Sequence, residues 1–143
     1  MNSRWAPGPG GGPQYFSGMG PITYDRLSID GYRTCSITMQ MPMVAQDFYN
    51  PLINVSGQSG IVWGFTIRVV DANYISYVAQ FFDSQKKSIG MVEDKITDKV
   101  SYEFKQIPST FKIPTGAAFV GLSIKFMGTI TACTYYAPTA YYV

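Results

Sequence analysis

Histidine is absent from this chain of 143 residues. Histidine is the commonest general base near neutral pH and the commonest protein ligand for metals. Its absence excludes Ser/His/Asp and Cys/His nucleophilic catalysis, together with histidine-based zinc, copper and iron sites. The sequence also lacks a phosphate-binding loop, because Gly57 and Gly60 are not followed by the lysine that such a loop needs. We therefore expect a protein that is not an enzyme and holds no organic cofactor.

Charge is also scarce. Charged residues make up 14% of the chain, the net charge is +2, and Lys86 and Lys87 are its only adjacent basic pair. This distribution leaves no basic footprint for nucleic acid. No apolar run approaches the roughly 20 residues that span a bilayer, and the first residues lack the apolar core of a signal peptide. We expect no nucleic-acid partner, no membrane span and synthesis as a soluble chain, unless a leader has been removed.

Two cysteines, Cys35 and Cys133, are too few for a disulfide scaffold or a zinc cage. They lie near the two ends of the domain, in segments that could form neighbouring strands. A Cys35–Cys133 disulfide is one interpretation. The favoured alternative is a pair of buried thiols that pack as small hydrophobic groups.

Acidic residues offer two further kinds of site. A carboxylate pair, as in glycosidases, would have to come from one charged run and its neighbourhood. The candidates are Glu93, Asp94, Asp98 and Glu103. Lys95 and Lys99 are interleaved with them, which favours a solvated turn instead. Calcium needs only oxygen ligands, although no calcium-loop spacing is present. Its candidate ligands are Asp71, Asp83 and Asp94.

What the sequence does contain is alternation of apolar and polar residues. After the turn Ile113-Pro114-Thr115-Gly116, the even-numbered residues of 118–126 are all apolar, whereas the odd-numbered ones include glycine, serine and lysine. This period of two is typical of a strand with one face on a core. The extended segments expected by the same reasoning are 21–30, 32–41, a short one at 52–55, 61–70, 74–82, 88–92, 99–105, the stretch 111–126 that contains this turn, and 129–136.

These strands are separated by turn signals and almost no helical sequence. We expect a long connection over 42–60, a hairpin turn at 71–73, a helical turn at 93–98 and a turn at 127–128. Short strands at this spacing predict an all-β, antiparallel β-sandwich of jelly-roll type. The sandwich is expected to span residues 22–143.

Residues 1–21 differ from the rest of the chain. They are rich in glycine and proline, which disfavours regular helix or central strand. They also carry large apolar side chains that a solvated spacer does not need. These are Trp5, Tyr15, Phe16 and Met19. We expect an extended N-terminal arm that docks either on its own domain or on a neighbouring copy.

Tyrosine is abundant, with 11 residues. Exposed aromatic side chains could stack on sugar rings or form a protein–protein interface, since both uses need large, rigid contact area. The candidates for such a surface are Trp63, Tyr135, Tyr136, Tyr141 and Tyr142. The alternative is that many of the aromatic residues belong to the core.

Two segments carry a resemblance to known proteins. Residues 77–86 (YVAQFFDSQK) and 111–120 (FKIPTGAAFV) resemble a hairpin and a strand of jelly-roll domains of the carbohydrate-binding-module type. The sequence departs from that pattern at Gln85, where glycine is usual. The resemblance covers roughly residues 61–136 and implies the jelly-roll fold. Its motifs specify no sugar-binding residue.

The arm suggests a second resemblance. A jelly roll behind a Gly/Pro-rich arm is similar to self-assembling subunits of bacterial surface or spore appendages. That resemblance implies a noncatalytic structural subunit that forms a filament or layer with copies of itself, located outside the cell on a cell or spore surface. An arm can add to an exposed sheet edge of its neighbour. The alternative is a carbohydrate-binding module that binds a glycan through exposed aromatic residues.

Overall fold

The computed structural model describes residues 15–29 and 31–143, with side chains left undescribed at residues 25–28. It contains strands and no helix within these residues, and every strand pair is antiparallel. The all-β, antiparallel prediction is therefore confirmed. The strands are β1 (Phe16–Met19), β2 (Ile22–Ile29), β3 (Tyr32–Asn54), β4 (Gly60–Phe82), β5 (Ser88–Lys95), β6 (Lys105–Lys112) and β7 (Phe119–Tyr142).

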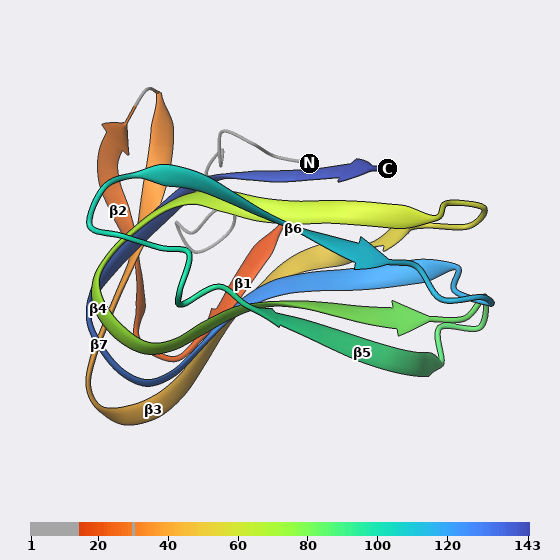
Figure 1. The fold of residues 1–143 in the computed structure, drawn as a ribbon, viewed down its shortest axis with the longest axis horizontal. Helices are drawn as coiled ribbons and strands as arrows, with labels where there is room; N and C mark the ends of the chain where they lie inside the picture. The colour runs from red at the N-terminus through yellow and green to blue at the C-terminus, as the bar shows by residue number, and fades with distance from the viewer. Residues whose placement is uncertain (1–14, 30) are drawn as a thin grey trace.

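The three longest strands, β3, β4 and β7, bend in the middle and so build a sandwich from one folded sheet. Figure 1 shows all three curving round at the same end of the molecule. Layer A contains β2, residues 32–39, residues 130–142, residues 60–69 and β6, in that order. Layer B contains β1, residues 43–54, residues 119–128, residues 74–82 and β5.

The bends explain why the predicted turns at 71–73 and 127–128 are wrong as chain reversals. Both segments lie inside continuous strands, where the β4–β7 register shifts. Gly128 has a φ of 80°, which a glycine adopts without strain. The side chain of Asn73 accepts hydrogen bonds from the backbone N–H and the hydroxyl of Thr129, at 2.7 and 2.5 Å. Turn-type residues here carry a strand from one layer into the other.

The predicted connection over 42–60 is also wrong, because β3 continues to Asn54. Pro42 lies in the β3 bend, and Pro51 lies in another register shift, between Tyr49 and Ile53. A proline cannot donate to a ladder, so it is accommodated at such irregular positions. Met41 also lies in this bend and is exposed.

Two smaller predictions near β5 are corrected as well. The first half of the helical turn expected over 93–98 is strand, since β5 continues to Lys95, and a turn follows. The strand expected over 99–105 is a loop, and β6 begins only at Lys105. The backbone carbonyl of Ser101 in this loop accepts from the N–H of Val69, at 2.8 Å. The loop therefore lies along β4 without extending the β6 ladder.

The core lies between the two layers and is rich in aromatic rings. The predicted core face of 118–126 is confirmed, because its even-numbered residues are all buried. Hydrogen bonds of three aromatic side chains cross the core: Trp63 Nε1–H donates to the Ser123 carbonyl at 2.9 Å, Tyr77 O–H to the Ile107 carbonyl at 2.8 Å, and Tyr135 O–H to Asp47 Oδ2 at 2.9 Å. They satisfy the polar ends of side chains whose rings are otherwise packed against apolar groups.

The N-terminal arm is described only in part, and Trp5 lies outside the described residues. The part described belongs to the sandwich: β1 pairs with β3, from Phe16 opposite Tyr49 to Met19 opposite Gln46. Phe16 is buried in the core of its own chain, which is one of the two expected alternatives for the arm. Tyr15 and Met19 are about half exposed.

Candidate functional site

The outer face of layer B carries a groove of about 210 Å³. Its floor is β7, the central strand of the layer, which presents the small residues Gly121 and Ser123. The neighbouring strands carry larger side chains, Phe48 from β3 and Phe82 from β4. Small residues on a central strand between large ones on its neighbours produce a channel that follows the strand direction. Further lining residues are Gln46, Asn50, Leu52, Val78, Gln80 and Met91.

Gly121 determines how deep the groove is. A Cβ atom at this position would lie 3.3 Å from Cδ2 of Leu52 and 3.6 Å from Cε2 of Phe82. The backbone of β7 is therefore the surface that a bound molecule would touch between these two side chains. Any larger residue at position 121 would fill this part of the groove.

Two glutamine amides lie on either side of the groove floor. Gln46 Nε2 donates to the Ser123 hydroxyl at 2.8 Å, and Gln80 Nε2 donates to the Ser88 hydroxyl at 3.3 Å. These contacts fix the orientation of both side chains. An amide offers two donor hydrogens and an acceptor oxygen, so it can pair with a hydroxyl group that is itself both donor and acceptor.

One end of the outer face is polar and charged. Glu93 Oε1 accepts hydrogen bonds from the hydroxyls of Ser76 (2.6 Å) and Tyr74 (3.0 Å), and it lies 3.5 Å from Lys125 Nζ. Desolvation raises the pKa of the Glu93 carboxyl, but these hydrogen bonds and the lysine charge outweigh it, so the net pKa is lowered. Glu93 is thus a carboxylate held by partners, and not a carboxylic acid poised to give up a proton.

The groove residues were not among those predicted from the sequence. Gln46 and Phe48 fall in the segment expected to be a connection, so no outward face was assigned to them. A usable signal was present in 118–126, whose predicted outer row contains Gly121 and Ser123. Two small residues in the middle of an outward row indicate a hollow.

Three predicted surface aromatics are instead buried, which corrects that prediction. Trp63 and Tyr135 are 0% exposed between the layers, where aromatic packing is most favourable. Tyr136 does lie on the outer face of layer A, but the rings of Tyr32 and Phe104 cover it, at 5.8 and 5.3 Å between centroids. None of the three can form a glycan-stacking surface in this fold.

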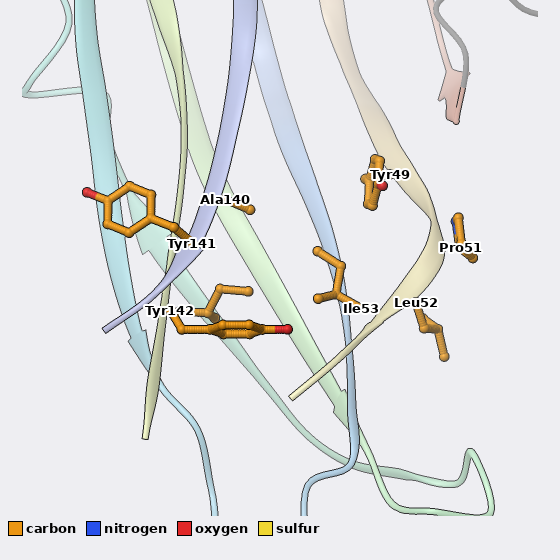
Figure 2. Close-up of a pocket in the computed structure, with 8 residues that line it drawn as sticks. Tyr49, Pro51, Leu52, Ile53, Ala140, Tyr141 and Tyr142 are labelled. Carbon is orange, nitrogen blue, oxygen red and sulfur yellow. The ribbon is translucent and has the colours of Figure 1, made fainter. Parts of the chain in front are cut away.

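Tyr141 and Tyr142, the remaining predicted aromatics, are exposed near the end of β7. They line a second hollow, the end pocket, of about 340 Å³. Figure 2 shows the Tyr142 ring lying across the space between β7 and β3, while Tyr141 extends to the other side of β7. The Tyr142 hydroxyl donates to the carbonyl of Asn54. The hollow is larger than the groove and mainly apolar.

In the described part of the chain, the cysteines are free thiols, and the acidic residues form no metal-binding cluster. Cys35 and Cys133 lie on the paired strands β3 and β7 as buried thiols, which agrees with the favoured alternative to a disulfide. Burial raises the pKa of the Cys133 thiol. No group of three histidine, cysteine or acidic residues that could hold a metal ion occurs within residues 15–29 and 31–143.

Two of the three candidate calcium ligands, Asp83 and Asp94, have separate partners. Asp83 accepts from the backbone N–H groups of Gln85 and Lys87, both at 2.9 Å, and so shapes the turn after β4. Asp94 accepts from the Ser109 hydroxyl and pairs with Lys99 at 3.2 Å. Within the described residues there is also no helix of the length and hydropathy needed to cross a membrane.

Comparison with solved structures supports the fold. The chain is similar to the CBM22-1 xylan-binding domain of Paenibacillus barcinonensis Xyn10C, with a TM-score of 0.59 and 8% sequence identity. The match covers 91% of this chain and 86% of that domain. The module TmCBM61, solved with β-1,4-galactotriose, has a TM-score of 0.57 and 9% identity, with 91% and 90% of the two chains covered. The chain thus has a β-sandwich fold like that of carbohydrate-binding modules.

A larger protein contains a similar unit. The enzymatically active domain of tailspike protein 4 from bacteriophage CBA120 has a TM-score of 0.65 and 10% identity over 91% of this chain. This chain spans only 20% of that protein. No protein-family model matches the sequence, and no curated protein matches it.

Proposed function

We propose that this protein is a noncatalytic glycan-binding module and that a polysaccharide chain binds in the groove on the outer face of layer B. The observation that carries the proposal is the combination of a glycine-floored channel, aromatic walls and paired amides on one open face. Ligand sites combine apolar surface with a few placed polar groups. A sugar ring needs both, because its faces are apolar and its rim carries hydroxyl groups.

Each groove residue has a definite task in this proposal. Phe48 is 37% exposed, so part of its ring is available to pack against the C–H face of a sugar. Gln46 and Gln80 hydrogen-bond hydroxyl groups on the two sides of the ring. Gly121 lets the sugar approach the backbone of β7. The xylan-binding and galactotriose-bound modules that share the fold are consistent with this use, although the shared fold does not itself transfer a ligand.

Binding is tested by isothermal titration with soluble polysaccharides, including xylan and a β-1,4-galactan. We expect Phe48→Ala to weaken binding about tenfold, equivalent to roughly 1.4 kcal/mol. Tyr102→Ala is the matched control, since Tyr102 is an exposed aromatic residue (73%) in the loop before β6. Equal loss in both variants, or no binding of any polysaccharide by the parent protein, would refute the proposal.

Self-assembly through the N-terminal arm stays a prediction. The described part of the arm pairs with β3 of the same chain. Electron microscopy of the full chain beside a chain lacking residues 2–20 addresses it. Filaments or layers formed only by the full chain would support an assembling subunit, whereas assembly by both would show that the arm is not the connector.

A further inference from the structure

The end pocket and the groove meet at one short segment of β3. Tyr49 and Leu52 line both hollows. On the groove side, Cδ2 of Leu52 lies 3.3 Å from the position that a Cβ atom would take at Gly121 on the floor. On the other side, the neighbouring residues Pro51 and Ile53 line the end pocket and not the groove. A ligand that lies in the groove beside Leu52 is therefore next to the end pocket.

This junction exists because β3 is irregular here. Tyr49 pairs with Leu122 of β7 and Ile53 pairs with Val120, so residues 50–52 of β3 stand opposite the single residue 121 of β7. Extra residues in one strand interrupt the regular alternation of side chains between its two faces. Of the three extra residues, Asn50 lines the groove, Pro51 lines the end pocket and Leu52 lines both. The irregular segment is therefore the ridge between the two hollows.

The end pocket differs from the groove in its chemistry. Among the described residues, those that line it are three tyrosines and five aliphatic residues, Pro51, Leu52, Ile53, Ile61 and Ala140. The hydroxyl of Tyr142 already donates to the Asn54 carbonyl. Sugar hydroxyls buried here would lose water without the amide partners that the groove offers, which costs free energy. A flat apolar group has no hydroxyls to desolvate, and it packs well against aromatic and aliphatic walls.

The size and shape of the end pocket suit one ring-sized group. Its volume of about 340 Å³ lies at the lower end of the range for ligand pockets, roughly 300–1,000 Å³. Figure 2 shows Ile53 and Ala140 directed into the space between β3 and β7, with the Tyr142 ring lying across it. Tyr142 is 46% exposed, so part of its ring is available for contact. The space therefore favours a single apolar ring over a further length of polysaccharide.

We propose that the end pocket binds an aromatic group attached to the glycan whose sugar chain lies in the groove. The ligand class is then a polysaccharide that carries aromatic groups, either as esters of sugar hydroxyls or as an aglycone at the chain end. The position of the sugar chain rests on the proposed function. The preference for an aromatic group is a separate claim, because it depends on the end pocket alone.

Titration calorimetry tests this with a xylo-oligosaccharide and a β-1,4-galacto-oligosaccharide, each as the free sugar, a benzoyl ester and a benzyl glycoside. We expect an aromatic form to bind about tenfold more tightly than the free sugar, because its ring is removed from water. A gain with the ester places the group on a sugar hydroxyl, and a gain with the glycoside places it at the chain end. Equal affinities of all forms would overturn the inference and leave the groove proposal standing. No binding of any form would overturn both.

Substitution in the end pocket sharpens the test. Ala140→Phe fills the hollow, so it should remove the tenfold gain and leave the affinity for the free sugar unchanged. Ala132→Phe is the matched control, because Ala132 lies near the bend of the same strand and outside both hollows. Phe48→Ala should weaken all forms alike and keep their ratio. A gain that survives in Ala140→Phe, or that is lost equally in Ala132→Phe, contradicts the assignment.

A second variant and a second readout cover the case in which Ala140→Phe fails to fold. Tyr142→Ala removes the exposed ring that lies across the hollow, and it should reduce the gain severalfold without changing the affinity for the free sugar. In amide NMR spectra of the parent protein, the aromatic form should move the signals of Ile53 and Ala140, whereas the free sugar should not. Both forms should move Gly121. An unchanged gain in Tyr142→Ala, or identical shifts with both forms, would overturn the inference.

Discussion

The outer faces of the two layers use aromatic residues in opposite ways. On layer A, Tyr136 lies beneath Tyr32 and Phe104, and the Arg68 guanidinium lies 4.9 Å from the centre of the Phe104 ring. On layer B, Phe48 and Met91 remain exposed beside a glycine-floored groove. The loop before β6 covers one face, and no described segment covers the groove on the other. Similar residues therefore stabilise the fold on layer A and are available to a ligand on layer B.

The largest expected effect is on the covered face. Tyr136→Ala removes a buried ring and leaves a cavity beneath Phe104, so the free energy of unfolding should fall by about 3 kcal/mol. Denaturant titration measures the loss. Glycan affinity of the folded protein should not change, and a change in affinity at constant stability would contradict the division between the faces.

The second prediction concerns Asp47, which faces the core, whereas its neighbours Gln46 and Phe48 on β3 face the groove. Burial raises the pKa of Asp47 to about 6, although the Tyr135 hydrogen bond opposes this, and no described group donates to its Oδ1. Because the folded-state pKa lies above the ordinary value of 3.8, the folded protein binds this proton more tightly. The contribution of Asp47 to the free energy of unfolding is therefore greatest below about pH 4. It is lost as the pH rises from about 4 through about 6, a total of roughly 2–3 kcal/mol.

Thermal unfolding between pH 4 and pH 7 tests this sign. Asp47→Asn keeps an acceptor for the Tyr135 hydroxyl and removes the ionisation, so it should flatten this part of the profile. Glycan affinity should keep the same pH dependence in both proteins. A parent protein that becomes more stable across this window, with the change removed by Asp47→Asn, would show that the carboxyl is stabilised in its charged form.

A third change fills the open face. Gly121→Leu should reduce glycan affinity about a hundredfold, roughly 2.7 kcal/mol, because its side chain occupies the space between Leu52 and Phe82. Stability should change little, since the contacted atoms belong to side chains that can shift. Titration calorimetry and a denaturant curve on the same sample check the two halves of this prediction.

The smallest effect concerns the polar side of the groove. Gln80→Ala should weaken glycan binding about fivefold, the loss of one hydrogen bond of about 1 kcal/mol. Gln85→Ala is its control, because Gln85 lies in the turn after β4 and outside the groove lining. Equal affinities for the parent protein and Gln80→Ala would remove this amide from the site.

Sequence periodicity predicted the core better than it predicted the chain path. The alternation over 118–126 identified a buried row correctly because burial on one side is a local property of a strand. The same reasoning interpreted Asp71-Ala72-Asn73 as a reversal, whereas the pairing of β4 with β7 continues past it. Whether polar residues reverse a strand or bend it depends on partners distant in the sequence.

The candidate site was predicted less well. Aromatic content did not distinguish Trp63, which is buried, from Phe48, which faces the groove. Pro42 and Pro51 indicated a loop, and this hid the outward row that contains Gln46. Only the small residues Gly121 and Ser123 gave a local signal, and their meaning depends on the larger residues of β3 and β4 that flank them in space.

The most direct test of the glycan-binding groove is an amide NMR titration of the full chain with xylan and β-1,4-galactan oligosaccharides. We predict saturable shifts at Gln46, Phe48, Gln80, Gly121 and Ser123, with the layer A residues around Tyr136 unchanged. Two results would contradict the assignment of layer B as the binding face. One is a set of shifts confined to layer A or to the end pocket, and the other is the absence of shifts with both sugars and with a wider polysaccharide panel.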